Sequence, residues 1–250
     1  MTRSGSVAAL VLGAGRGERL GHALPKAFVR LDGQSLIERS IRALAASGVI
    51  DRIVPVLGRA DVERFRALGL SAVDELVDPV VGGAERQDSM QAGLESLPAT
   101  IELVAIHDAA RCLVAAADVR AVVAAAKEDG AAILAERVKD TIKRVVDGRI
   151  VETPDREECW AAQTPQVVRR DWLALAIEAN RGTGRTSTDD AQLVEWSGRA
   201  VRVVEAGSPN PKITRPEDLV LAKALLAEQA KAEAKTGKGD VDVRGEGAHR

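Results

Sequence analysis

The chain has 250 residues, of which 46% are hydrophobic and 2% aromatic, and its formal charge is −2 at pH 7. This length is enough for an α/β domain with a sizeable core. The near-neutral charge and the lack of aromatic rings argue against nucleic-acid binding, which needs a basic field and stacking platforms. No apolar run approaches the roughly 20 residues that cross a bilayer. We therefore expect a cytoplasmic protein with no nucleic-acid or membrane partner.

Short apolar runs alternate with apolar stripes at helical spacing along most of the chain. The runs predicted to be buried strands are Val7–Leu12, Ile53–Leu57, Leu103–Ile106, Ala131–Ala135 and Val201–Val204. A capping box of Ser35 and Glu38 precedes a predicted helix at Leu36–Ala46. This alternation predicts a Rossmann-like α/β fold, in which helices flank a mostly parallel sheet.

Residues 138–153 interrupt the alternation with two polar-studded strands around an Asp147-Gly148 turn. A two-stranded hairpin is marginally stable alone, so we expect this β-arm to pack on a second subunit and form a homodimer. Residues 230–250 are polar and dotted with glycine, which predicts a disordered C-terminal tail after one domain at 1–229.

A glycine-rich loop follows the first predicted strand. Gly13, Gly15 and Gly17 allow backbone N–H groups to approach a phosphate. A dinucleotide-binding fingerprint needs a helix that begins within the motif, but Pro25 interrupts any such helix. The cations that follow, Arg16, Arg19 and Lys26, suit a triphosphate that is cleaved, because negative charge builds up on the departing pyrophosphate.

A second polar segment, His107-Asp108-Ala109-Ala110-Arg111, follows the Leu103–Ile106 strand. Ligands of open α/β sheets gather at the carboxyl ends of strands, where Asp108 could hold Mg²⁺ between phosphates. His107 ends an apolar strand, and we expect it to orient the loop rather than to act as a base.

These motifs together carry a resemblance. G-A-G-x-G-x-R-L followed by P-K resembles the signature loop of sugar-phosphate nucleotidylyltransferases. Later motifs narrow the resemblance: H-D-A-A-R, V-K-D-T-I-K from Val138, T-P-Q from Thr164 and K-I-T-R-P-E-D-L from Lys212. In this order they are similar to the 2-C-methyl-D-erythritol 4-phosphate cytidylyltransferase family, over roughly residues 7–226.

The resemblance implies transfer of CMP from CTP to 2-C-methyl-D-erythritol 4-phosphate, with Mg²⁺ or another divalent cation, in the non-mevalonate isoprenoid precursor pathway. It implies that CTP is bound by Ala14, Gly15, Gly17, Gly82 and Ser89. It gives Arg19 and Lys26 the role of stabilising the transition state, with Lys212 as a third catalytic cation, and it gives Asp108 the role of metal ligand. The residues implied around the acceptor are Arg111, Thr141, Arg156, Thr164 and Lys212, of which Thr141 and Arg156 would come from the partner subunit. Cys112 stands where the family usually has a proline, so the loop after Arg111 lacks the fixed φ of that residue.

The proposed reaction needs no general base, because a phosphate monoester with a second pKa near 6 is already mostly ionised at neutral pH. Three alternatives stay open at this point. They are a cytidylyltransferase that acts on ribitol 5-phosphate, an NAD-dependent oxidoreductase domain, and a nucleotide-binding regulator without catalysis.

Overall fold

The structure of the chain, a computed structural model, describes residues 5–15 and 24–238. Its central sheet consists of β1 (Val7–Leu12), β4 (Arg52–Leu57), β5 (Val80–Val81), β6 (Leu103–Asp108), β7 (Ala131–Arg137), β10 (Trp160–Arg169) and β11 (Arg202–Glu205). The strand order is β11-β7-β10-β6-β1-β4-β5, and only β10 runs antiparallel to its neighbours. The predicted Rossmann-like, mostly parallel sheet is confirmed.

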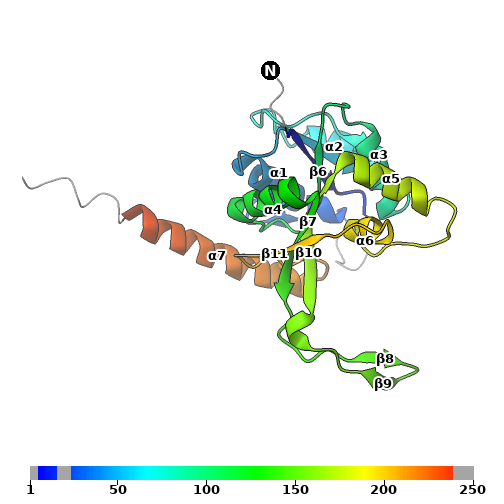
Figure 1. Cartoon of the computed structure of the whole chain (residues 1–250). Coiled ribbons are helices and arrows are strands. Elements are labelled where there is room, and N and C mark those ends of the chain that lie inside the picture. The colour runs from blue at the N-terminus through cyan, green and yellow to red at the C-terminus, as the bar shows by residue number, and fades with distance from the viewer. Residues whose placement is uncertain (1–4, 16–23, 239–250) are drawn as a thin grey trace, which may run out of the picture.

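Helices cover both faces of the sheet (Figure 1). They are α1 (Leu36–Ala46), α2 (Val62–Arg66), α3 (Arg86–Glu95), α4 (Ala116–Asp129), α5 (Arg170–Asn180), α6 (Asp190–Trp196) and α7 (Pro216–Lys238). In β1, Ala9 and Val11 pack in one apolar cluster with residues of α1, α2 and α4, while Ala8 and Leu10 pack in another with residues of α3, α5 and α6. Because both faces of β1 are buried, it reads in the sequence as an unbroken apolar run rather than an alternating one.

The N-terminus of α1 is capped as predicted, but only by half of the capping box. The Ser35 hydroxyl accepts a hydrogen bond from the Glu38 backbone N–H at 3.3 Å. The Glu38 carboxylate pairs instead with Arg42, one turn further along the helix, at 3.1 Å. The cap residue was therefore read correctly, whereas the reciprocal bond was wrong because an i,i+4 cation competes for the carboxylate.

The predicted β-arm is present as β8 (Arg144–Val146) and β9 (Arg149–Glu152), and it projects from the sheet beyond the ends of β7 and β10 (Figure 1). Asp147 and Gly148 join the strands with φ values of 48° and 74°, the left-handed conformation that a two-residue hairpin turn of this kind requires. The paired strands are shorter than the predicted 138–153 segment, since residues 138–143 approach the hairpin outside any strand.

The shorter elements lie in the connections. In the described part of the chain they are β2 (Arg30–Leu31), β3 (Gln34–Ser35) and the 3₁₀ turns η2 (Lys26–Phe28), η3 (Arg59–Asp61) and η4 (Arg156–Glu158). Helix α7 begins at Pro216 and continues to Lys238, so it reaches into the segment predicted to be a tail. Residues 239–250 lie outside the described part of the chain, and the disorder of the tail stays a prediction. Among the described helices, none combines the length and apolar character needed to cross a membrane.

Candidate active site

A cavity of about 190 Å³ lies at the carboxyl edge of the sheet, where β1 and β6 end. Segments far apart in the sequence line it: the loop after β1, the turn at Lys26, the loop before α3, the end of β6, and Lys212. A larger hollow of about 650 Å³ lies at the opposite edge, around Gly130 and Trp172. None of the motif residues lines that larger hollow, so the smaller cavity is the candidate active site.

The first glycine loop is partly described. Gly13 donates its backbone N–H to the carbonyl of Val56 at 2.8 Å, and a Cβ at this position would lie 3.0 Å from Leu57, so the glycine allows β1 and β4 to close up. A Cβ at Gly15 would meet no atom within 4 Å, so this residue faces open space beside the cavity. Ala14 and Gly15 line the cavity, and their predicted contact with CTP stays a prediction. The predicted residues Gly17 and Arg19, and Arg16 with them, lie outside the described residues.

The second glycine loop leads into α3. A Cβ at Gly82 would lie 2.6 Å from the Ser89 hydroxyl, and one at Gly83 would overlap the Asp88 side chain, so both positions need glycine. Ser89 lines the cavity, although its hydroxyl is buried and donates to the Glu85 carbonyl at 3.2 Å. The N-terminus of α3 therefore borders the cavity with the positive end of its dipole, which favours a phosphate there.

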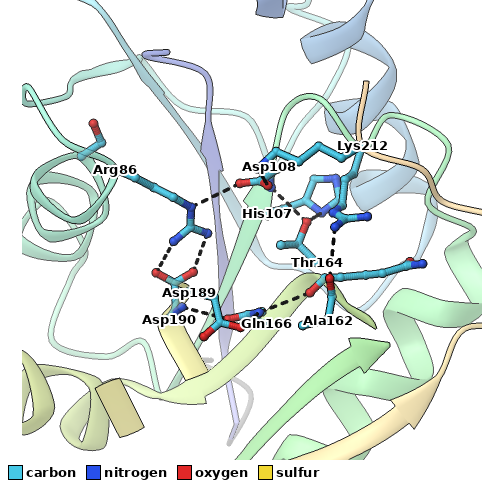
Figure 2. A network of polar contacts seen from close by, with 12 residues as sticks. Arg86, His107, Asp108, Ala162, Thr164, Gln166, Asp189, Asp190 and Lys212 are labelled. Atoms are coloured by element: carbon cyan, nitrogen blue, oxygen red, sulfur yellow. Dashed lines mark hydrogen bonds and ion pairs between the residues drawn. The ribbon is translucent and has the colours of Figure 1, made fainter. Parts of the chain in front are cut away.

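Asp108, at the end of β6, is the charged centre of the cavity (Figure 2). Its carboxylate lies 2.6 Å from the Lys212 ammonium nitrogen and 3.4 Å from Nε of Arg86. Burial alone would raise the pKa of Asp108, but the opposite effect of the Arg86 and Lys212 charges is larger, and the pKa is lowered to about 2. Asp108 is therefore ionised at neutral pH. Lys26 lines the same cavity, so two of the predicted catalytic cations, Lys26 and Lys212, share the cavity with the predicted metal ligand.

The donor set suits Mg²⁺ only if the substrates complete it. Within residues 5–15 and 24–238, no three His, Cys, Asp or Glu side chains are grouped so that they could hold a metal ion. Mg²⁺ is commonly held by one or two carboxylates together with substrate phosphates and water. The ionised Asp108 carboxylate fits that role beside a triphosphate.

Thr164 contacts both Asp108 and the neighbouring His107. The Thr164 hydroxyl accepts a hydrogen bond from the Asp108 backbone N–H at 3.1 Å and lies 3.0 Å from Nδ1 of His107 (Figure 2). Burial lowers the pKa of His107 to about 4, so its ring is neutral at pH 7. This position fits the predicted orienting role of His107. The buried Thr164 hydroxyl faces Asp108 and His107 here, and its contact with the acceptor stays a prediction.

Arg111 is fixed by tertiary contacts. Its guanidinium donates to the carbonyl of Asn210 at 2.9 Å and to that of Ala162 at 3.1 Å. The side chain of Cys112 packs in an apolar cluster with Leu113 and Ile213. The loop after Arg111 is thus held by packing and hydrogen bonds in place of the proline.

The structure does not bring Thr141 and Arg156 to the cavity of their own chain. Both are exposed, Thr141 on the arm and Arg156 in η4 just after it, where Arg156 donates to the Lys139 carbonyl at 3.4 Å. Their assignment to the site of a second subunit stays a prediction.

The sequence predicted no individual role for four polar residues beside the cavity, Arg86, Gln166, Asp189 and Asp190, although Gln166 belongs to the T-P-Q motif. The Arg86 guanidinium makes two hydrogen bonds, of 2.8 and 2.7 Å, to the buried carboxylate of Asp190. Gln166 accepts from the backbone N–H of Asp190 at 3.0 Å and donates to Asp189 at 3.0 Å (Figure 2). The adjacent acidic residues Asp189 and Asp190, just before an apolar stripe, were the sequence signal that could have pointed to this pair. Their partners lie far away in the sequence and could not be identified from it.

The fold and this cavity define an α/β protein with a cavity at the carboxyl edge of a mostly parallel sheet, lined by cations and a carboxylate of the kind that nucleotidyl transfer requires. The family model for 2-C-methyl-D-erythritol 4-phosphate cytidylyltransferase matches residues 7–228. The chain belongs to this family, whose members are nucleotidyltransferases.

Individual relatives agree with the family. The 2-C-methyl-D-erythritol 4-phosphate cytidylyltransferase of Geobacillus kaustophilus is 42% identical over 220 residues, which cover 88% of this chain and 96% of the relative. The crystal structure of the enzyme of the same name from Thermus thermophilus superimposes with a TM-score of 0.72 at 32% identity, covering 88% of this chain and 98% of that one. A 4-diphosphocytidyl-2C-methyl-D-erythritol synthase structure from Anaerococcus prevotii gives a TM-score of 0.81 at 27% identity, covering 90% of this chain and 100% of that one.

Proposed function

We propose that this chain transfers CMP from CTP to 2-C-methyl-D-erythritol 4-phosphate, which yields 4-diphosphocytidyl-2-C-methyl-D-erythritol and pyrophosphate in the non-mevalonate isoprenoid precursor pathway. The observation that carries the proposal is the meeting of Asp108, Lys212 and Lys26 in a single cavity bordered by both glycine loops. Membership of the cytidylyltransferase family supports the same reaction.

In this reaction an oxygen of the acceptor phosphate attacks the α-phosphorus of CTP, and the bond to the β,γ-diphosphate breaks. The acceptor phosphate is mostly dianionic at neutral pH, so no side chain has to remove a proton. The neutral, buried His107 agrees with this, because it has no route to a substrate proton. Catalysis then consists of bringing two anions together and neutralising their charge.

The side chains divide between the two anions. The glycine loop with Ala14 and Gly15, and the second loop with Gly82 and Ser89, would hold CTP, and Lys26 would stabilise the charge that develops on the leaving pyrophosphate. Lys212 would hold the acceptor phosphate, together with Arg111. Arg19 and Gly17 keep their predicted roles as transition-state stabiliser and CTP-binding residue.

A divalent cation, most simply Mg²⁺, would be held by Asp108. When bound, it would supply further neutralisation of the triphosphate. The Lys212 ammonium nitrogen lies 2.6 Å from one carboxylate oxygen of Asp108. Asp108 would therefore lie between the residues that hold CTP and Lys212, which would hold the acceptor phosphate.

The arm supports a homodimer. Val145, Val146, Ile150 and Val151 are all about half exposed or more, which is unusual for four apolar residues of one short hairpin. If a second copy of the chain covered these residues, Thr141 and Arg156 of the first copy would lie near the cavity of the second. A cytoplasmic location also remains a prediction.

A pyrophosphate-release assay tests the proposal. CTP, UTP, ATP and GTP are each combined with methylerythritol phosphate or ribitol 5-phosphate in the presence of Mg²⁺. Release only with CTP and methylerythritol phosphate supports the proposal. Release with ribitol 5-phosphate instead would replace the acceptor, and CTP binding without release would indicate a regulator.

A further inference from the structure

An ion pair of unusual burial lies beside the nucleotide half of the cavity. The Asp190 side chain is 2% exposed, and the Arg86 guanidinium meets it with two parallel hydrogen bonds of 2.8 and 2.7 Å. Paired bonds of this length are typical of a charge-assisted guanidinium–carboxylate pair. A buried pair is costly to desolvate, so its presence needs a reason beyond stability.

The Asp190 end of the pair is rigidly placed. The side-chain oxygen of Gln166 accepts hydrogen bonds from the backbone N–H groups of Asp190 and Ala191, at 3.0 and 2.9 Å. Its side-chain nitrogen donates to Asp189 at 3.0 Å, and Asp189 in turn caps α6 by accepting from the Gln192 backbone. The first turn of α6 is thereby tied to the central strand β10.

The Arg86 end of the pair faces the catalytic carboxylate. Arg86 is the first residue of α3, directly after the loop that lines the cavity, and its Nε lies 3.4 Å from Asp108 (Figure 2). Both terminal nitrogens are committed to Asp190, so only Nε addresses Asp108, at a long distance. Burial alone would lower the pKa of Arg86, but the opposite effect of the Asp190 and Asp108 carboxylates is larger. The pKa is raised, and the residue stays charged.

We propose that Asp190 is a positioning residue: it holds the Arg86 guanidinium so that its terminal nitrogens do not close onto Asp108. Without Asp190, the terminal nitrogens of Arg86 would turn to the nearest carboxylate, Asp108, and compete with the divalent cation for it. This inference rests on the proposed function, because it gives Asp108 the role of metal ligand.

The test is Mn²⁺ binding at saturating CTP without acceptor, measured by electron paramagnetic resonance, so that no turnover occurs. Asp190→Asn should raise the Kd for Mn²⁺ roughly tenfold, the effect of a coupling of about 1.4 kcal/mol between contacting groups. Adding Arg86→Gln to this variant removes the competing cation, and the Kd should return to within about threefold of the parent value. Asp171→Asn, which breaks the exposed Arg169–Asp171 pair at the other edge of the sheet, is the matched control and should leave the Kd unchanged.

A purely structural role for the pair predicts the opposite order, in which the double variant binds Mn²⁺ as weakly as Asp190→Asn or more weakly. That order, or an unchanged Kd in Asp190→Asn, would overturn the proposal. Where Asp190→Asn does not fold by circular dichroism, Arg86→Gln alone decides: Mn²⁺ should bind at least as tightly as in the parent, and weaker binding contradicts the proposal. A parent that shows this pattern but releases no pyrophosphate refutes the proposed function and leaves the positioning role standing.

Discussion

The buried ring of His107 makes the stability of the protein sensitive to mild acid. The side chain is 0% exposed, and burial lowers its pKa from 6.5 to about 4 in the folded state. The unfolded chain therefore takes up a proton at this residue as the pH falls below 6.5, while the folded chain does not until about pH 4. Because the unfolded state binds the extra proton in this window, the free energy of unfolding falls with the pH. A pKa difference of this size corresponds to a loss of about 3 kcal/mol between pH 7 and pH 4.

Urea denaturation at pH 7, 6, 5 and 4 measures this loss. Other carboxylates also titrate towards pH 4, so the comparison is with His107→Gln, which keeps a polar side chain beside Thr164 but has no group that titrates here. The parent should lose about 3 kcal/mol more than the variant over the range, whatever their difference at pH 7. Asp108, whose pKa is lowered to about 2 in the folded state, also costs stability near pH 4, where the unfolded chain begins to protonate it, but parent and variant share this loss. Parallel stability curves for parent and variant would refute the assignment of a neutral, buried His107.

Three further predictions follow from the site, the arm and the cysteines. Lys26→Ala and Lys212→Gln should each lower kcat by roughly 10²–10³-fold, because each removes a hydrogen-bond donor that stabilises the charge of the transition state. The thermal midpoint should change little. Near-normal turnover in either variant would contradict the role given to that lysine. Replacement of residues 139–152 by a short glycine linker should give a monomer in analytical ultracentrifugation, and this monomer should release little pyrophosphate. A fully active monomer would refute the proposal that the arm contributes residues to the site of a second subunit. Cys112 is buried with its pKa raised to about 11, so a thiol reagent at pH 8 should label Cys159 first, and faster labelling of Cys112 would contradict its packing.

Much of the sheet could be predicted because its parallel strands are buried on both faces. Runs such as Val7–Leu12 have no polar residue that could be read otherwise, and β1 has the predicted bounds. Strand β10 was missed because Gln163, Thr164, Pro165 and Gln166 interrupt its apolar pattern. Thr164 contacts Asp108 and His107, Gln166 contacts Asp189 and Asp190, and the strand's pairing with β7 is irregular between Ala162 and Gln166.

The candidate site was predictable as far as local motifs carried it. Asp108, Lys26 and Lys212 belong to short motifs, and the fold brings all three to one cavity. The Arg86–Asp190 pair joins residues 104 positions apart, and nothing in either local sequence specifies the other. Only the packing of α6 against the sheet decides that contact, so it had to be observed.

The central claim is that a phosphate oxygen of the acceptor attacks the α-phosphorus of CTP. The most direct measurement uses methylerythritol phosphate labelled with ¹⁸O at its terminal phosphate oxygens, incubated with CTP, Mg²⁺ and the protein, followed by ³¹P nuclear magnetic resonance and mass spectrometry of both products. All of the label should appear in the cytidyl diphosphate product and none in pyrophosphate. Label in pyrophosphate, or a labelled acceptor recovered unchanged while CTP is hydrolysed, would contradict it.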